Sequence, residues 1–286
     1  IRQNLFNKPL VGTFHTYFMK SEYLRLIKME DIETITKMGW RLSKFIYNQA
    51  DILTTPSRHT KKDMQAHGFS TSIKVIENGV PFNKKIKLEL KTPVYDMPEK
   101  YLLYVGRLSP EKSLEVLIHA FNKFRKNYPD IHLVLVGDGP HKKKLKTLAA
   151  ALNLNKRVHF LGLVPHEQLQ QSAIYSSAIA FVTPSKSEVQ PVSVIEAMNF
   201  GLPIIAADVG TFTELIGKNG ILCKQDSTAD LAKAMKICAT DGEARTKMGN
   251  ASKQIAQRFH LKSTVNKLEG VYDKLLQKYK TDGHKT

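Results

Sequence analysis

The chain has 286 residues, 42% of them hydrophobic and 24% charged, which excludes a disordered or low-complexity protein and favours a globular chain of two domains. Lysine and arginine total 43 against 26 acidic residues, and the formal charge of +17 favours contact with polyanions or with an anionic membrane surface. Cys223 and Cys238 are the only cysteines, with neither metal-ligand spacing nor a disulfide framework, so we expect a cytoplasmic protein.

Residues 1–85 are expected to form a partial N-terminal Rossmann-like domain. Apolar runs predict strands at Leu10 to Thr13, Ile52 to Thr55 and Ile73 to Ile76, with a long helical region between the first two. Because the sequence opens with Ile1 and reaches its first strand almost at once, we expect the start of this domain to lie outside the chain. No apolar run approaches the ~18 residues that a membrane-spanning helix needs, so any membrane contact is expected to be peripheral.

Residues 86–100 are expected to be a linker, because turn residues at 77–81 lead into a lysine-rich segment. From residue 101 onward, short apolar runs alternate with amphipathic stretches, a pattern typical of β-α units around a parallel sheet. We therefore predict a second Rossmann-like domain over residues 101–260, followed by a C-terminal helix at 261–286 that packs back toward the N-terminal domain. The predicted strands are Tyr101 to Val105, His132 to Val136, Val158 to Phe160, Ala178 to Val182 and Pro203 to Ala206, and apolar stripes from Leu114 to Phe124 and from Leu231 to Cys238 predict helices.

The segment from Gly106 to Lys112 has the features of a phosphate-binding loop. It follows a predicted strand and leads into a helix, so the glycine lets the backbone approach an anion and the helix N-terminus offers N–H groups. Arg107 and Lys112 add two cations, five residues apart, that can grip a diphosphate from one side. The alternative is a solvated loop with two surface cations, which are common in so basic a chain.

Two glutamates, Glu188 and Glu196, follow another predicted strand. Glu188 precedes Pro191 and is expected in a loop, whereas Glu196 falls within the helical run from Ser193 to Met198. Carboxylates at this spacing can accept hydrogen bonds from two hydroxyl-bearing parts of one ligand. The alternative is an ordinary pair of surface charges, which is the default for glutamates.

The sequence as a whole resembles glycosyltransferase family 4, whose hallmark is two glutamates separated by seven residues and followed by Ala-Met and Gly-Leu-Pro. This chain has the pattern from Glu188 to Pro203. The resemblance implies an α/β fold of the GT-B type, with two Rossmann-like domains of parallel sheets, of which the N-terminal one is incomplete here. Further matching segments are Gly106-Arg107 with Lys112, Gly137-Asp138-Gly139-Pro140, Phe160-Leu161-Gly162 and Asn78-Gly79-Val80.

The resemblance also implies a retaining glycosyltransferase that moves a hexose from a nucleotide-diphosphate sugar, with UDP-sugars favoured, to an acceptor hydroxyl in the interdomain cleft. It assigns the donor diphosphate to Arg107 and Lys112 and to the backbone N–H groups of Val192 and Ser193 at a helix N-terminus. No metal or other cofactor is expected, because these cations are expected to do that electrostatic work.

The resemblance assigns the ribose hydroxyls to Glu196, the base side to Leu163 and Val164, and hydroxyls of the donor sugar to Glu188. His15, in the strand-end segment Thr13-Phe14-His15-Thr16, is the catalytic candidate together with Glu188. The family is generally thought to use no covalent enzyme intermediate, so the two glutamates are not expected to act as a hydrolase acid/base pair. The donor loops also include Gly106, Val189, Gln190 and Pro191, the last standing where the family usually has glycine and supplying no N–H.

The segments Gly12 to Tyr17 and Ser187 to Pro191 resemble the lipid-glycosylating branch of the family, which includes diacylglycerol glycosyltransferases. A lipid acceptor at the cytoplasmic face of a membrane, with peripheral contact to anionic lipid, also agrees with the positive charge. The alternatives are the same chemistry on a soluble or polysaccharide acceptor, and a non-catalytic nucleotide-binding module in a truncated chain. The sequence has no recognised nucleic-acid reader motif, so no specific nucleic-acid partner is expected.

Overall fold

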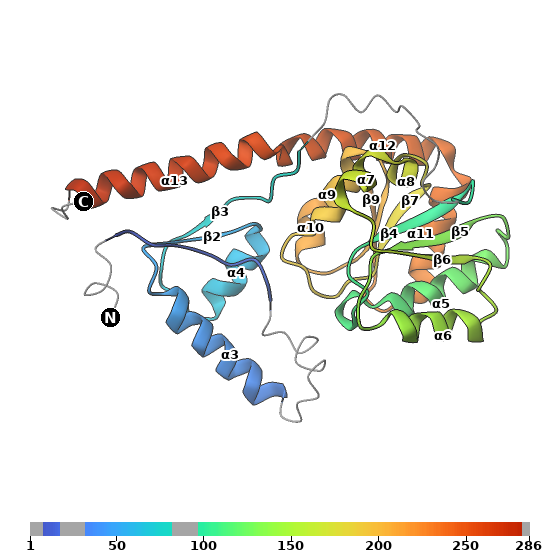
Figure 1. Cartoon of the computed structure of the whole chain (residues 1–286), viewed down its shortest axis with the longest axis horizontal. Coiled ribbons are helices and arrows are strands. Elements are labelled where there is room, and N and C mark those ends of the chain that lie inside the picture. The colour runs from blue at the N-terminus through green and yellow to red at the C-terminus, as the bar shows by residue number, and fades with distance from the viewer. Residues whose placement is uncertain (1–7, 18–31, 82–96, 282–286) are drawn as a thin grey trace. The chain divides into compact units, whose positions relative to one another are not determined.

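The structure, a computed structural model, describes residues 8–17, 32–81 and 97–281 (Figure 1). Residue contacts divide the chain into two compact units. Unit 1 comprises Ile1–Pro81, Glu188–Gln190 and Phe259–Thr286, and unit 2 comprises Phe82–Ser187 and Pro191–Arg258. Most of the predicted linker, up to residue 96, lies outside the described residues.

Unit 1 is built on a three-stranded parallel sheet in the order β1-β2-β3. Helix α4 begins where the Ser57 hydroxyl accepts a hydrogen bond from the Thr60 amide at 3.1 Å, a common way for serine to cap a helix. Aromatic rings fill the core, and Phe14 stacks on Trp40 with ring centroids 6.0 Å apart. The elements of this part are β1 (Val11–Thr13), α3 (Ile32–Tyr47), β2 (Ile52–Thr55), α4 (Arg58–Ala66) and β3 (Ile73–Val75), and each strand lies within its predicted run.

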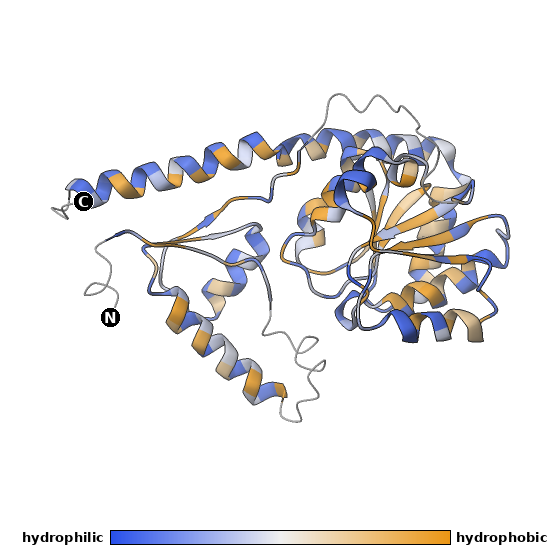
Figure 2. Ribbon diagram, in the orientation of Figure 1, coloured by the Kyte–Doolittle hydropathy of each residue, from blue (hydrophilic) through white to orange (hydrophobic). Residues whose placement is uncertain are grey.

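The last helix, α13 (Leu261–Thr281), belongs to unit 1 through the segment that follows β3. Glu77 forms an ion pair with Lys267 at 2.7 Å. At Gly79 an added Cβ atom would lie 2.7 Å from the Cα atom of Leu261, so the chain approaches the helix where only glycine fits. Along its length α13 has no fully buried residue, and Figure 2 shows apolar and polar residues alternating on it.

Unit 2 is built on a six-stranded parallel sheet in the order β6-β5-β4-β7-β8-β9. Counted from β4, this is the 3-2-1-4-5-6 order of a Rossmann domain, in which the direction of strand order reverses between the first and fourth strands, here β4 and β7. The predicted α/β class with parallel sheets is therefore confirmed. The strands are β4 (Tyr101–Val105), β5 (His132–Val136), β6 (Val158–Gly162), β7 (Ala180–Thr183), β8 (Ile204–Ala207) and β9 (Gly220–Cys223), and the sequence did not predict β9.

Helices cover the six-stranded sheet because its strands are apolar on both faces, as Figure 2 shows. Helices α5 and α11 pack against each other through apolar stripes that include Leu117, Phe121 and Met235, all of them buried. The helices are α5 (Leu114–Arg125), α6 (Lys142–Ala151), α7 (His166–Gln171), α8 (Ala173–Ser176), α9 (Val192–Asn199), α10 (Thr211–Leu215), α11 (Thr228–Thr240) and α12 (Gly242–Ala256), and the short 3-10 turns η2 (Pro110–Lys112) and η3 (Gln257–Phe259) follow β4 and α12.

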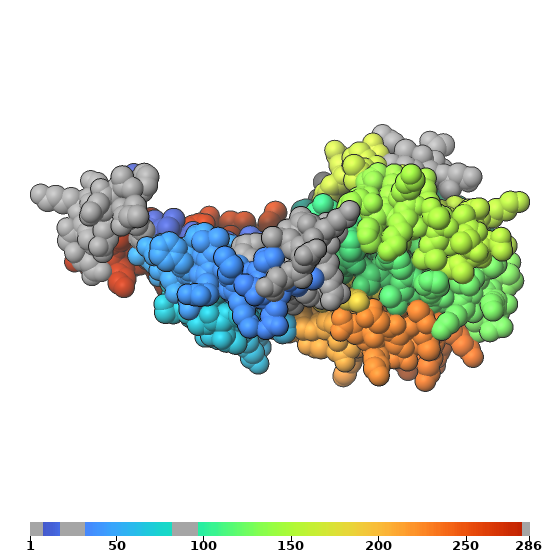
Figure 3. Space-filling view, turned by 90° about the horizontal axis from the view of Figure 1, so that it is seen from below, coloured from blue at the N-terminus to red at the C-terminus, as the bar shows by residue number. Residues whose placement is uncertain are grey.

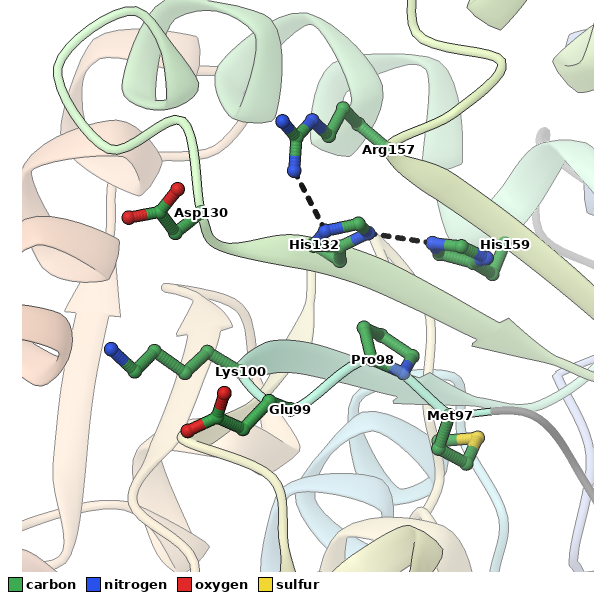
Figure 4. A pocket seen from close by; sticks show the side chains of 8 residues that line it. All are labelled: Met97, Pro98, Glu99, Lys100, Asp130, His132, Arg157 and His159. Atoms are coloured by element: carbon green, nitrogen blue, oxygen red, sulfur yellow. Dashed lines mark hydrogen bonds between the residues drawn. The ribbon is translucent and has the colours of Figure 1, made fainter.

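A cavity of about 510 Å³ opens at the amino ends of β4, β5 and β6 (Figure 4). Inside it the Arg157 guanidinium lies 2.8 Å from Nε2 of His132, whose Nδ1 lies 2.7 Å from Nε2 of His159. Because arginine can only donate, His132 accepts at Nε2 and donates from Nδ1, which makes it neutral. Burial, together with the nearby His159 and Arg157, lowers the pKa of His132 and keeps it in this state, although Asp130 opposes the shift.

Candidate active site in unit 2

The candidate site lies at the edge of the unit 2 sheet opposite to that cavity. Because the strands are parallel, their carboxyl ends meet at one edge, and the loops after β4 and β7 flank the point where strand order reverses. Ligands of open α/β sheets bind at such a point. Figure 1 shows β4 and β7 in the middle of this sheet. The two sequence-predicted regions of unit 2, residues 106–112 and the helix that carries Glu196, follow these two strands.

The loops after β4 and β5 are packed against each other with no spare room. The Gly106 amide donates to Val136 at 3.0 Å, and the Leu108 amide donates to Asp138 at 2.9 Å. At Gly137, where φ is +130°, an added Cβ atom would lie 2.0 Å from the Gly106 carbonyl oxygen. Only glycine can adopt this φ and also leave room for the carbonyl oxygen. The contact therefore fixes the backbone at Gly106, the residue directly before Arg107.

Asp138 has a structural role in the same pair of loops. Its carboxylate accepts from the Lys142 ammonium at 2.6 Å and from the Gly139 amide at 2.7 Å. The hydrogen bond from Lys142, followed by that from Gly139, lowers the pKa of Asp138, so the carboxylate stays ionised. The Gly-Asp-Gly segment noted in the sequence therefore shapes the loop.

Arg107 carries the exposed cation of this loop. Its backbone is held, because the Tyr104 hydroxyl donates to the Arg107 carbonyl at 3.0 Å, while its side chain faces solvent. Lys112 ends the short 3-10 turn that follows and is half-buried. A fixed backbone with an exposed guanidinium suits an anion that arrives from solution.

A buried glutamate that the sequence did not single out joins the loop after β4 to the loop after β7, the two strands between which strand order reverses. Glu111 is 2% exposed and accepts a hydrogen bond from the Ser109 hydroxyl through its side chain. Its carbonyl accepts from the Lys186 amide, in the loop after β7, at 3.0 Å. The loop of Arg107 and the loop that leads to α9 are thus one connected structure.

The N-terminus of α9 follows the loop after β7 and has no side-chain cap. Pro191 stands at the cap position and offers no side-chain acceptor to the amides of Val192 and Ser193. Val192 is 41% exposed. These first-turn amides and the positive end of the helix dipole suit an anion. Because a cap residue's own N–H does not belong to the helix's hydrogen-bonded turns, proline is tolerated at this position.

Glu196 lies one turn further along α9 and is 5% exposed. Its Oε1 lies 2.6 Å from Nε2 of His166, and its Oε2 accepts from the Tyr175 hydroxyl at 2.9 Å. Burial raises the pKa of Tyr175 well above its ordinary value, and the charge of Glu196 adds to the effect, so the phenol stays protonated and donates. Neither partner could be identified from the sequence, because they lie 30 and 21 residues away from Glu196.

The loop after β6 presents an apolar residue near the same sheet edge. Gly162 has φ +76°, and its carbonyl accepts from the Gly137 amide at 2.7 Å. Leu163 is 78% exposed and Val164 is half-buried. An exposed leucine beside a polar loop suits a flat ring, which is the base-side role that the resemblance predicts for this turn.

The remaining candidates, His15 and Glu188, lie in unit 1. His15 is exposed directly after Phe14, which is fully buried, and Glu188 is half-buried directly before Val189, which is 6% exposed. Phe14 and Val189 belong to one buried apolar cluster. The two candidates therefore flank the same core and lie in one region of unit 1.

Gln190 fixes the short 188–190 segment within unit 1. Its side-chain oxygen accepts from the Asn78 amide at 2.6 Å, and its carbonyl accepts from the Asn78 side chain at 3.3 Å. The donor-loop role predicted for Gln190 is thus joined by a structural one. This pairing gives Asn78, the first residue of the Asn78-Gly79-Val80 segment, a structural role. The ligand roles predicted for all of these residues stay predictions.

Comparison with protein families gives two matches that together cover nearly all of the chain. Residues 87–255 match the family described as glycosyl transferases group 1. Residues 1–84 match the family described as glycosyltransferase family 4. The boundary between the two matches falls beside the boundary between the two units, at residues 81 and 82.

Named relatives are identical to this chain at more than a quarter of the aligned positions. Sulfoquinovosyl transferase SQD2 of Arabidopsis thaliana is 28% identical over 91% of this chain and 51% of its own length. A D-inositol 3-phosphate glycosyltransferase of Corynebacterium efficiens is 28% identical over 95% of this chain and 67% of its own length. The chain thus spans about half the length of the first of these relatives.

Solved structures agree with the fold. Sucrose-phosphate synthase from Thermosynechococcus elongatus superposes with a TM-score of 0.79 at 25% identity, covering 96% of this chain and 70% of that one. HepE from Anabaena, solved with UDP and glucose, superposes with a TM-score of 0.76 at 22% identity, covering 93% of this chain and 72% of that one. The fold is therefore of the GT-B type.

Proposed function

Because the chain belongs to the family of glycosyl transferases group 1, we propose that unit 2 binds the nucleotide-diphosphate sugar of a retaining hexosyl transfer. The observation that carries the proposal is that Arg107 and the uncapped N-terminus of α9 follow β4 and β7, the two strands between which strand order reverses, and that the loops after these strands are hydrogen-bonded to each other. The acceptor in this proposal is a hydroxyl group.

The chemistry asked of unit 2 is charge stabilisation. As the bond between sugar and diphosphate breaks, negative charge builds on the leaving phosphate. Arg107, Lys112 and the amides of Val192 and Ser193 would meet that charge with fixed donors, which need no reorganisation during the reaction. We propose that these groups supply the stabilisation that a metal ion supplies in other transferases.

The other assignments of the proposal follow the family pattern. Glu196 would accept from the ribose hydroxyls, and Leu163 with Val164 would lie along the base. His15 and Glu188 are the proposed catalytic residues at the donor sugar. Proton NMR of the glycosylated product as it first forms would report, through the signal of the anomeric proton, whether the configuration of the sugar is retained.

Nucleotide sugars should raise the apparent melting temperature of the protein. A ligand that binds only the folded state stabilises it by about 2.7 kcal/mol at a hundred times its dissociation constant, which corresponds to a shift of several degrees for a chain of this size. The panel consists of UDP-glucose, UDP-galactose, UDP-N-acetylglucosamine and GDP-mannose, in EDTA and again with magnesium. HepE, solved with UDP and glucose, is the reason to begin with UDP-glucose.

Two variants test whether this shift in melting temperature comes from the candidate site, one at the site and one as a control. In Glu196→Ala the ligand-induced shift should vanish, whereas in Glu269→Ala, an exposed glutamate of α13, it should match the wild type. The quantity compared is the shift with ligand, since loss of Glu196 also lowers the starting stability. Equal shifts in both variants would contradict the site, and binding without any transfer would favour a non-catalytic nucleotide-binding module.

We further propose that the acceptor is a lipid and that α3 lies on the anionic membrane that holds it. Met38, Leu42, Phe45 and Ile46 follow one face of α3 and are 55–66% exposed. Cationic side chains from the same helix, Lys37 and Arg41, are exposed beside them, and Figure 3 shows α3, in blue, at the surface. An apolar stripe bordered by cations is typical of a helix that lies in a membrane interface. Among the described residues, no helix is long and apolar enough to cross a bilayer.

Serine substitution of Leu42 and Phe45 together should lower binding to vesicles containing phosphatidylglycerol by at least tenfold. Burying each of these side chains in the interface contributes roughly 1.5–3 kcal/mol, and each cation near the surface adds about 1 kcal/mol. Vesicle flotation measures the effect. Tyr272→Ser with Leu276→Ser, both about half-exposed on α13, is the matched control. Equal flotation of the two double variants, or no preference for anionic vesicles, would favour a soluble or polysaccharide acceptor.

A further inference from the structure

The carboxylate of Glu196 is held by two side chains of different character. Tyr175, on α8, is fully buried and donates to Oε2 at 2.9 Å. His166, the first residue of α7, has a 59% exposed side chain and lies with Nε2 2.6 Å from Oε1. One partner belongs to the core and the other reaches in from the surface.

This arrangement leaves acceptor capacity on the carboxylate. Its two oxygens offer about four lone-pair directions, and Tyr175 and His166 each use one. The carboxylate can therefore still receive two hydroxyl hydrogen bonds, which is the number that a ribose diol offers. The Glu196 side chain is only 7% exposed, and His166 reaches it from the surface.

Two partners are needed because of how a glutamate side chain moves. The last torsion of glutamate, which turns the carboxylate about its bond, has a broad and shallow preference. A single hydrogen bond from Tyr175 would anchor one oxygen and leave the plane of the group free to turn. The second hydrogen bond, from His166, fixes that plane.

We propose that His166 is a positioning residue for the donor nucleotide, which sets the plane of the Glu196 carboxylate so that its remaining lone pairs meet the ribose hydroxyls. This inference rests on the proposed function, because it takes Glu196 as the ribose acceptor. His166 also starts the helix that follows Leu163 and Val164, the turn proposed to lie along the base. The base side and the ribose side of the nucleotide are joined through this histidine.

Loss of His166 should have a selective effect on binding. The His166→Ala variant should lose the part of the affinity for the nucleoside diphosphate that the ribose hydroxyls contribute, and should keep the rest. The probes are UDP with its 2′-deoxy and 3′-deoxy forms, or GDP with its deoxy forms if GDP-mannose is the donor that stabilises the protein. Calorimetry should give wild type about a tenfold preference for the ribose form over at least one deoxy form, equivalent to about 1.4 kcal/mol. In His166→Ala that ratio should fall to about twofold or less, with little change in affinity for the deoxy form.

Matched variants separate positioning from mere structure. In His166→Gln the side-chain amide nitrogen replaces the donating Nε2 at similar reach, so this variant should keep the preference for the ribose form. His166→Asn places its amide closer to the backbone and should lose the preference. His119→Ala, an exposed histidine of α5, is the control and should match the wild type.

Three outcomes would contradict this role of His166. A wild-type preference that persists in His166→Ala would overturn the inference while the proposed function stands. An equal loss of affinity for the ribose and deoxy forms would do the same, since it would show a general structural effect. Absence of nucleotide binding to the wild type would overturn the proposed function and this inference with it. Melting curves of each variant show that it is folded, as expected for an exposed side chain.

Discussion

Donor turnover should fall by about 10²–10³-fold in Arg107→Ala, the range seen when one fixed donor to a developing negative charge is removed. The guanidinium is exposed, and the loop is held through the backbone carbonyl, which the Tyr104 hydroxyl contacts at 3.0 Å. The substitution therefore removes the cation without removing a contact of the fold. Turnover of Arg107→Lys should lie between that of the wild type and that of Arg107→Ala, because lysine keeps the charge but not the two-pronged geometry that matches a phosphate.

Release of the nucleoside diphosphate during transfer measures this effect, at saturating donor and again at low donor. Arg58→Ala removes an exposed arginine at the start of α4 and serves as the matched control. Melting temperatures of the three variants should agree within a degree or two. Turnover in Arg107→Ala equal to that of Arg58→Ala would show that the loop after β4 has no part in stabilising the leaving group.

Much of the fold could be predicted from sequence because the buried strands are short, apolar and bounded by glycine or proline. β4 and β5 were predicted at their observed bounds. β9, at Gly220–Cys223, was missed, since three of its four residues are only half-buried and it begins with glycine at the edge of the sheet. The order of strands in the sheet was also beyond prediction, because pairing of β4 with β7 joins segments about eighty residues apart through packing.

The candidate site was predictable where chemistry follows the chain and not where it depends on contacts between distant segments. Arg107 and Glu196 were singled out by the residues around them in sequence. Tyr175 and His166, which hold Glu196, carry no local signal, because an ordinary tyrosine and an ordinary histidine become partners only when α8 and α7 pack beside α9. Glu111 is similar: its burial, which decides its role, comes from the loops folded over it.

Gly137→Ala should destabilise unit 2 by about 3–5 kcal/mol, the largest effect on stability that we expect from one methyl group here. The added Cβ would lie 2.0 Å from the Gly106 carbonyl oxygen, a backbone atom that cannot turn aside. Residue 137 also has φ +130°, a conformation that side chains other than glycine rarely adopt. Relief of the clash requires the loops after β4 and β5 to separate, and Arg107 directly follows the displaced carbonyl.

The loss should therefore appear in two measurements. Chemical unfolding of unit 2, followed by circular dichroism, should show the lower stability, and any protein that remains folded should bind nucleotide sugar more weakly than wild type. Gly217→Ala is the matched control, because a Cβ atom there meets nothing within 4 Å, and its stability should stay within about 0.5 kcal/mol of wild type. Unfolding of Gly137→Ala that matches Gly217→Ala would mean that the two loops do not share the close contact from which the position of Arg107 follows.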